Sequence, residues 1–142
     1  MKKSFLIFTI LVSIFTSCSK KDDAPSEIDQ MKVLISAKMW KLSTTVLITT
    51  SGNVNQTIPA CRLDNLWEYN TNGNFSLFPG TNKCSPTEVT TLGTWQITDS
   101  KGLKVTLSSG SYTDEILLLE SNKLQLKYTL GSGAYIDTYI PN

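Results

Sequence analysis

The 142-residue chain contains no histidine. This absence excludes Ser-His-Asp and Cys-His catalytic machinery, histidine-ligated zinc and any imidazole pH switch. Charge is also sparse: 13 Lys and Arg against 12 Asp and Glu give a formal net charge of +1, which argues against a nucleic-acid partner. The length suits one globular domain, and a hydrophobic content of 40% is too high for a disordered chain.

The apolar run over residues 5–15 is too short to span a bilayer, which needs about 20 apolar residues. It follows Lys2 and Lys3, and this arrangement is typical of a secretory signal peptide. The run ends in Phe15-Thr16-Ser17-Cys18, which resembles the lipobox of bacterial lipoproteins. The resemblance implies a signal peptide over 1–17, acylation of Cys18 by fatty acids such as palmitate, and a flexible tether over 18–25. The alternative is an ordinary signal peptide with an incidental cysteine.

The residues after Cys18 bear on where such a lipoprotein would be anchored. Ser19 is not the Asp that retains lipoproteins in the inner membrane, so the resemblance implies sorting to the outer membrane. The run Lys20-Lys21-Asp22-Asp23 resembles a surface-export signal of Bacteroidetes-type lipoproteins, although a solvated spacer has the same composition. We therefore expect an outer-membrane anchor at Cys18, with the domain on the periplasmic side or the cell surface.

Two further cysteines, Cys61 and Cys84, form the one remaining pair of this exported chain. Such a pair most simply makes one disulfide. No His or further Cys completes a tetrahedral metal site, and the spacing is unlike the Cys-x-x-Cys of redox pairs. The sequence therefore predicts a structural Cys61–Cys84 disulfide worth somewhat more than about 3 kcal/mol in chain-entropy models.

The remaining pattern predicts one helix followed by strands. Ser26-Glu27-Ile28-Asp29 has the spacing of a capping box, and apolar residues follow at helical spacing, so we expect a short helix over 27–37. From Trp40 onward the apolar period is two, and turn residues such as Asn72-Gly73 separate the segments. We expect about eight strands, with a brief return pairing over 54–60; they span 40–49, 64–69, 74–78, 90–98, 103–107, 112–120, 124–130 and 134–140.

These strands predict an all-β, antiparallel, up-and-down fold. Parallel pairing needs long crossovers, and no segment after residue 40 is both long and helical. The sheet either closes into a barrel or folds as a sandwich. We favour the barrel, because closure removes exposed sheet edges.

The order of motifs resembles the lipocalin-like domain of exported Bacteroidetes-type lipoproteins. The motifs that carry this resemblance are Met39-Trp40-Lys41-Leu42, Cys61-Arg62-Leu63-Asp64, Asn72-Gly73-Asn74-Phe75, Cys84, Gly93-Thr94-Trp95-Gln96-Ile97 and Leu103-Lys104-Val105-Thr106-Leu107. The resemblance implies a small barrel domain over 26–142, a lipid anchor and an apolar pocket. It implies no catalytic residue and no cofactor.

Acid-base catalysis would need two carboxylates in one cleft. Asp114 and Glu115 are adjacent on a predicted strand, so their side chains point to opposite faces, and Asp22-Asp23 lies in the tether. No phosphate loop or calcium loop is present. We therefore expect a protein that is not an enzyme and holds no metal.

Five aromatic residues are candidates to face the barrel interior and contact a ligand: Trp67, Tyr69, Phe75, Trp95 and Tyr128. We expect a monomer that binds a small apolar ligand, lipid-like or aromatic, among these rings. The alternative is that the rings fill the barrel. The protein would then be a non-enzymatic interaction or inhibitor protein whose loops over 51–63 and 78–90 contact another envelope protein.

Overall fold

The computed structural model describes residues 24–99 and 101–142. The predicted signal peptide, Cys18 and most of the tether lie outside the described residues. Within the described ranges, no helix has both the length and the apolar character needed to cross a membrane. The elements are α1 (Glu27–Ser36), β1 (Trp40–Thr49), β2 (Gly52–Gln56), α2 (Ala60–Leu63), β3 (Leu66–Tyr69), β4 (Asn74–Phe78), β5 (Thr91–Ile97), β6 (Gly102–Leu107), β7 (Gly110–Glu120), β8 (Lys123–Leu130) and β9 (Gly133–Pro141).

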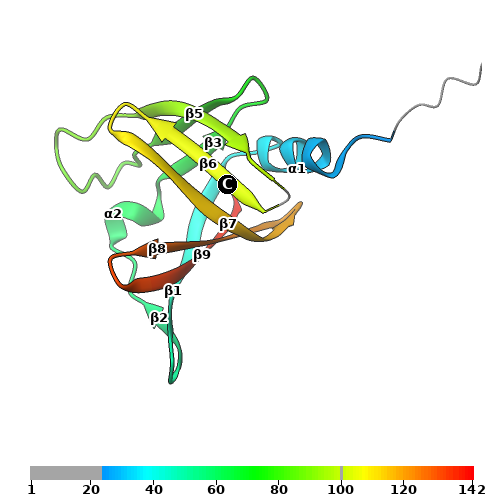
Figure 1. The fold of residues 1–142 in the computed structure, drawn as a ribbon. Coiled ribbons are helices and arrows are strands. Elements are labelled where there is room, and N and C mark those ends of the chain that lie inside the picture. Colours follow the sequence, from blue (N-terminus) through cyan, green and yellow to red (C-terminus); the bar gives the residue numbers. More distant parts are fainter. Residues whose placement is uncertain (1–23, 100) are drawn as a thin grey trace, which may run out of the picture.

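The strands form one antiparallel sheet that closes on itself (Figure 1). Strands β3 to β9 follow one another in order, and β1 closes the ring by pairing with β9 on one side and β3 on the other. Strand β2 pairs only with the far half of β1, so it extends a hairpin away from the ring. The predicted antiparallel barrel of about eight strands with a short N-terminal helix is confirmed.

Helix α1 covers one end of the barrel. Its first turn is capped as the sequence predicts, since the Ser26 hydroxyl accepts a hydrogen bond from the Asp29 amide at 3.1 Å. The inner face of the helix places Ile35 in the core, and the indole N–H of Trp40 donates to the Ile35 carbonyl at 2.8 Å. Trp40 is fully buried, so the end of the barrel beside α1 is closed.

The closed half of the barrel is packed with aromatic and aliphatic side chains. The Tyr69 ring meets those of Phe75 and Trp95 at centroid distances of 5.3 and 5.5 Å. Leu103 and Val105 of β6 are fully buried beside them. The indole N–H of Trp95 donates to the Asn70 carbonyl at 2.8 Å, so the polar atom of this buried ring has a partner.

Two irregularities change which residues face inward. A shift in the β1–β9 register between Leu42 and Thr44 turns Thr45 toward the interior, where simple alternation from Trp40 predicts Thr44. A second shift, in β7, lies within the run Ile116-Leu117-Leu118-Leu119, whose inward face the alternation leaves ambiguous. Ile116 is buried and Leu119 packs against the core, whereas Leu117 is exposed.

Candidate functional site

The barrel interior is hollow at the end opposite α1. A cavity of about 460 Å³ opens to solvent there, between side chains from the start of β7, the end of β8 and helix α2. This volume lies within the range of about 300–1,000 Å³ that small-molecule sites occupy. The residues that matter most for its chemistry are Trp67, Tyr112, Asp114, Tyr128, Asp137 and Tyr139.

The disulfide holds the rim of this cavity. Cys61 of α2 is bonded to Cys84 of the β4–β5 loop, with their Cα atoms 5.0 Å apart, so the predicted pairing is confirmed. The same loop is tied down a second time, because the Asp64 carboxylate accepts hydrogen bonds from the Thr81 hydroxyl and the Asn82 amide at 3.1 and 3.0 Å. Helix α2 is thereby fixed with Arg62 at the edge of the cavity.

Asp137 is the most deeply placed polar group of the cavity. Its side chain is only 3% exposed, on the inward face of β9. The Thr45 hydroxyl donates to Oδ1 at 2.6 Å, and the Tyr139 hydroxyl donates to Oδ2 at 3.3 Å. A longer contact of 3.5 Å brings the Tyr128 hydroxyl to Oδ1. These donors offset the cost of removing the carboxylate from water.

Asp114 faces the same cavity from β7. Burial, and secondarily the charge of Asp137, raise the pKa of the Asp114 carboxyl to about 6. Neither a hydrogen bond nor a cation among the described residues offsets these two influences. The next residue, Glu115, points to the outer face and forms an ion pair with Lys127 at 3.1 Å, as the alternation predicts.

The tyrosines of the cavity keep their protons across the physiological pH range. Burial raises the pKa of Tyr112 and of Tyr128 to about 12. Burial, followed by the charge of Asp137, raises the pKa of Tyr139 well above its usual value. The three hydroxyls are therefore available as hydrogen-bond donors to Asp137 or to a ligand.

The architecture is similar to that of solved proteins from Bacteroides. A lipocalin-like protein from Bacteroides uniformis ATCC 8492 matches with a TM-score of 0.53 over 74% of this chain and 96% of that chain, at 12% sequence identity. This chain has a lipocalin-like fold. An uncharacterized protein from Bacteroides eggerthii DSM 20697 matches with a TM-score of 0.49 over 71% of this chain and 96% of that chain, at 13% identity. No protein-family model matches the sequence, and no curated protein matches it significantly.

The lipocalin-like barrel separates the five predicted ligand-binding aromatics into two groups. Trp67 and Tyr128 line the cavity. Trp67 meets Tyr139 edge to face at 5.2 Å, and Tyr128 stacks on Tyr135 at 5.5 Å. The other three, Tyr69, Phe75 and Trp95, do not line this cavity and belong to the packed core at the closed end.

Four residues of the cavity are not predicted as site residues from the sequence: Arg62, Tyr112, Asp137 and Tyr139. For Asp137 and Tyr139 of β9 the sequence does contain a signal, since alternation puts both on one face of the strand together with Tyr135. The opposite face, with Ile136 and Ile140, is equally apolar in sequence, so the pattern alone does not show which face is inward. Arg62 carries no such signal, because it lies in the short helix α2 that the sequence does not predict.

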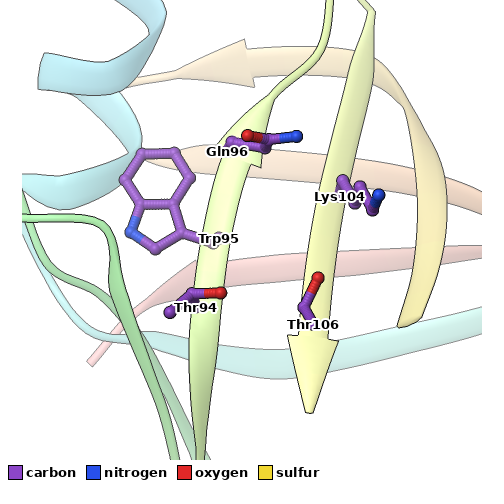
Figure 2. Close-up of a pocket in the computed structure, with 5 residues that line it drawn as sticks. All are labelled: Thr94, Trp95, Gln96, Lys104 and Thr106. Atoms are coloured by element: carbon purple, nitrogen blue, oxygen red, sulfur yellow. The ribbon is translucent and has the colours of Figure 1, made fainter. Parts of the chain in front are cut away.

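A second, smaller hollow lies on the outer surface of strands β5 and β6 (Figure 2). Its volume is about 170 Å³, and the side chains around it are mostly polar. Figure 2 shows the Trp95 ring projecting away from Gln96, Lys104 and Thr106, toward the other side of the strand. This hollow offers no apolar wall, so the cavity at the open end is the better candidate for a ligand site.

Proposed function

We propose that this protein is a lipid-anchored envelope protein that binds one small ligand in the open end of its lipocalin-like barrel. The observation that carries the proposal is the cavity of about 460 Å³ with aromatic walls and a few fixed polar groups. Small-molecule sites combine these two features, because apolar walls supply affinity and polar groups fix orientation. Barrels of eight strands have room for one such ligand.

The anchor and the cavity are compatible in geometry. Helix α1 begins at Glu27 and covers the closed end, only nine positions after Cys18 in the sequence. An acylated Cys18 would therefore attach the protein from the side of its closed end, at the other end of the barrel from the mouth of the cavity. The basis for the anchor itself is the short apolar run that ends in Phe15-Thr16-Ser17-Cys18.

Binding is a better description of this site than catalysis. Both oxygens of Asp137 accept hydrogen bonds from side-chain hydroxyls, which holds this carboxylate in a fixed position. A carboxylate held in this way can orient a ligand. The raised pKa of Asp114, about 6, also lies in the range of a general acid or base, so we propose binding as the simpler role of the site and assign no catalytic residue.

The second candidate is an interaction protein whose loops contact another envelope protein. Exposed apolar side chains near the disulfide-linked loop favour it, since Val89 is 74% and Leu92 is 67% exposed. Under this alternative the barrel would serve only as a scaffold, and filling the cavity would leave binding of the partner protein unchanged.

A cavity-filling variant tests the proposed function. Leu77 lines the cavity from β4, so Leu77→Trp should occupy part of the space and abolish binding of small molecules. The matched control is Leu92→Trp, the same change on the outer face of the neighbouring strand β5. Ligands are found by native mass spectrometry of the purified protein and by thermal-shift screening of amines, fatty acids and aromatic metabolites. Equal ligand responses in the wild type and both variants would contradict the proposal.

A further inference from the structure

The charged groups that line the cavity are two carboxylates and one guanidinium, and the other polar groups are hydroxyls. Asp114 and Asp137 line the same cavity from β7 and β9, and the charge of Asp137 helps to raise the pKa of the Asp114 carboxyl. Among the described residues, the ion pairs join Lys32 to Asp29 and Lys127 to Glu115, so neither cavity carboxylate has a cationic partner. Two like charges in one partly desolvated space are unfavourable until a cation joins them.

The aromatic walls favour the same kind of occupant. Four aromatic side chains line the cavity: Trp67, Tyr112, Tyr128 and Tyr139. The faces of such rings carry negative potential and attract an ammonium group, most strongly where water is excluded. Rings and carboxylates together form the environment that recognises an organic cation, whereas a fatty-acid carboxylate entering this space would be repelled.

Among the described residues that line the cavity, the one cation is Arg62, at its edge. Arg62 is exposed on α2, and its charge influences Tyr128 but is not among the influences on Asp114. The remaining charged groups near Asp114 are Asp99 and Lys101, between β5 and β6, and Glu115 of β7, which line a separate hollow together with Asp114. None of these three lines the cavity.

We infer that the cavity binds an organic ammonium ion, with its charged nitrogen between Asp114 and Asp137 and its apolar body against Trp67 and the tyrosine rings. This inference rests on the proposed function and narrows it to one ligand class. The hydroxyls of Thr45 and Tyr139 hold Asp137 in place, so the receiving site is formed before the ligand arrives.

Three small probes of nearly equal shape and different charge test this inference. They are 2-phenylethylamine, 2-phenylethanol and 3-phenylpropionate, titrated by calorimetry and tryptophan fluorescence into the full chain, expressed with its own signal sequence and held in lipid nanodiscs. Empty nanodiscs correct for partition into lipid. We expect the amine to bind more tightly than the neutral alcohol by about tenfold or more, and the carboxylate to bind most weakly.

The pH dependence provides an independent readout. Because Asp114 loses its proton near pH 6, amine affinity should rise about tenfold between about pH 5 and about pH 8. The carboxylate probe should follow the opposite trend. The amine itself stays protonated throughout this range, so the change reports the protein.

Matched variants assign the effect to the cavity. Asp114→Asn should weaken amine binding by about tenfold and remove its pH dependence. Glu115→Gln is the control, because it removes the same charge from the neighbouring position on the outer face and should leave amine affinity unchanged. Arg62→Gln should leave amine binding equal or tighter. Circular dichroism verifies that each variant is folded.

The outcomes separate this inference from the function on which it rests. Equal or tighter binding of the alcohol or the carboxylate, blocked by Leu77→Trp, would overturn the choice of ligand and leave the ligand site standing. Amine binding that Asp114→Asn does not weaken would also overturn the choice of ligand. Failure of every probe to bind, together with no co-purifying molecule, would overturn both proposals.

Discussion

Replacing Phe75 by Ala tests whether the closed half of the barrel is a packed core. Phe75 is 1% exposed on β4, and its ring contacts that of Tyr69 at a centroid distance of 5.3 Å. Truncating a buried Phe to Ala costs about 3–5 kcal/mol, because both the transfer free energy and the contacts around the new cavity are lost. The rigid barrel and α1 give the surrounding side chains little freedom to collapse into the space. We therefore expect a loss of about 4 kcal/mol from a typical total of about 5–15 kcal/mol.

The assay is urea denaturation of the oxidised protein, followed by tryptophan fluorescence and circular dichroism. With a denaturant slope of about 2 kcal/mol/M, the loss corresponds to a midpoint lower by about 2 M. Leu92→Ala is the control, since Leu92 lies on the outer face of β5 and is 67% exposed; its stability should change by at most about 0.5 kcal/mol. Equal stability changes in the two variants would refute the close packing of the closed half of the barrel.

Three further predictions concern the disulfide, the anchor and the cavity carboxylate. Replacing Cys61 and Cys84 by Ser should lower the free energy of unfolding by about 3 kcal/mol, measured in urea; an unchanged midpoint would contradict a stabilising bridge. Cys18→Ala should abolish labelling by a palmitate analogue, and persistent label would refute acylation at Cys18. The pKa of Asp114, raised to about 6 in the folded state, exceeds its unfolded value of about 4. The folded state therefore binds this proton more tightly, and stability should fall by on the order of 1–2 kcal/mol as pH rises through that window. Asp114→Asn should remove this fall in stability. Identical pH profiles of the free energy of unfolding in the wild type and the variant would contradict the prediction.

The parts of the fold that local chemistry determines could be predicted from the sequence. Ser26 caps α1 because a serine hydroxyl three residues before an amide satisfies a free helix N–H. Asn72-Gly73 turns β3 into β4 because glycine accepts the positive φ of 86° found there. The disulfide was predictable by counting cysteines in a chain that the sequence predicts to be exported. Each of these inferences depends on residues close in sequence or on a single possible pairing.

The chemistry of the cavity could not be predicted, because it depends on register. Thr45 donates to Asp137 across 92 positions of the chain, and it faces inward only because the β1 register shifts before it. A strand that slips by one residue moves every later side chain to the other face. Simple alternation therefore assigns Thr44 to the interior, and no partner for Asp137 is visible in the sequence. The proximity of Asp114 to Asp137 is equally invisible in the sequence. The two residues are on β7 and β9, which are not adjacent in the sheet, so no strand pairing brings them together.

The aromatic residues raised two alternatives, a filled barrel or a ligand pocket, and the barrel has a packed half and a hollow half. At the closed end the side chains of Trp40, Phe75 and Leu103 are apolar or have their one polar atom bonded, so close packing satisfies them completely. At the open end, apolar residues in place of the carboxylates would make a more stable core, because a buried carboxylate needs several hydrogen-bond donors to offset its lost hydration. Asp137 retains three hydroxyl contacts there, and Asp114 has no such compensation. Close packing at the closed end therefore stabilises the fold, whereas the two carboxylates at the open end add little stability. Packing does not explain why this tyrosine-lined half of the interior carries Asp114 and Asp137, and a bound cation would explain it.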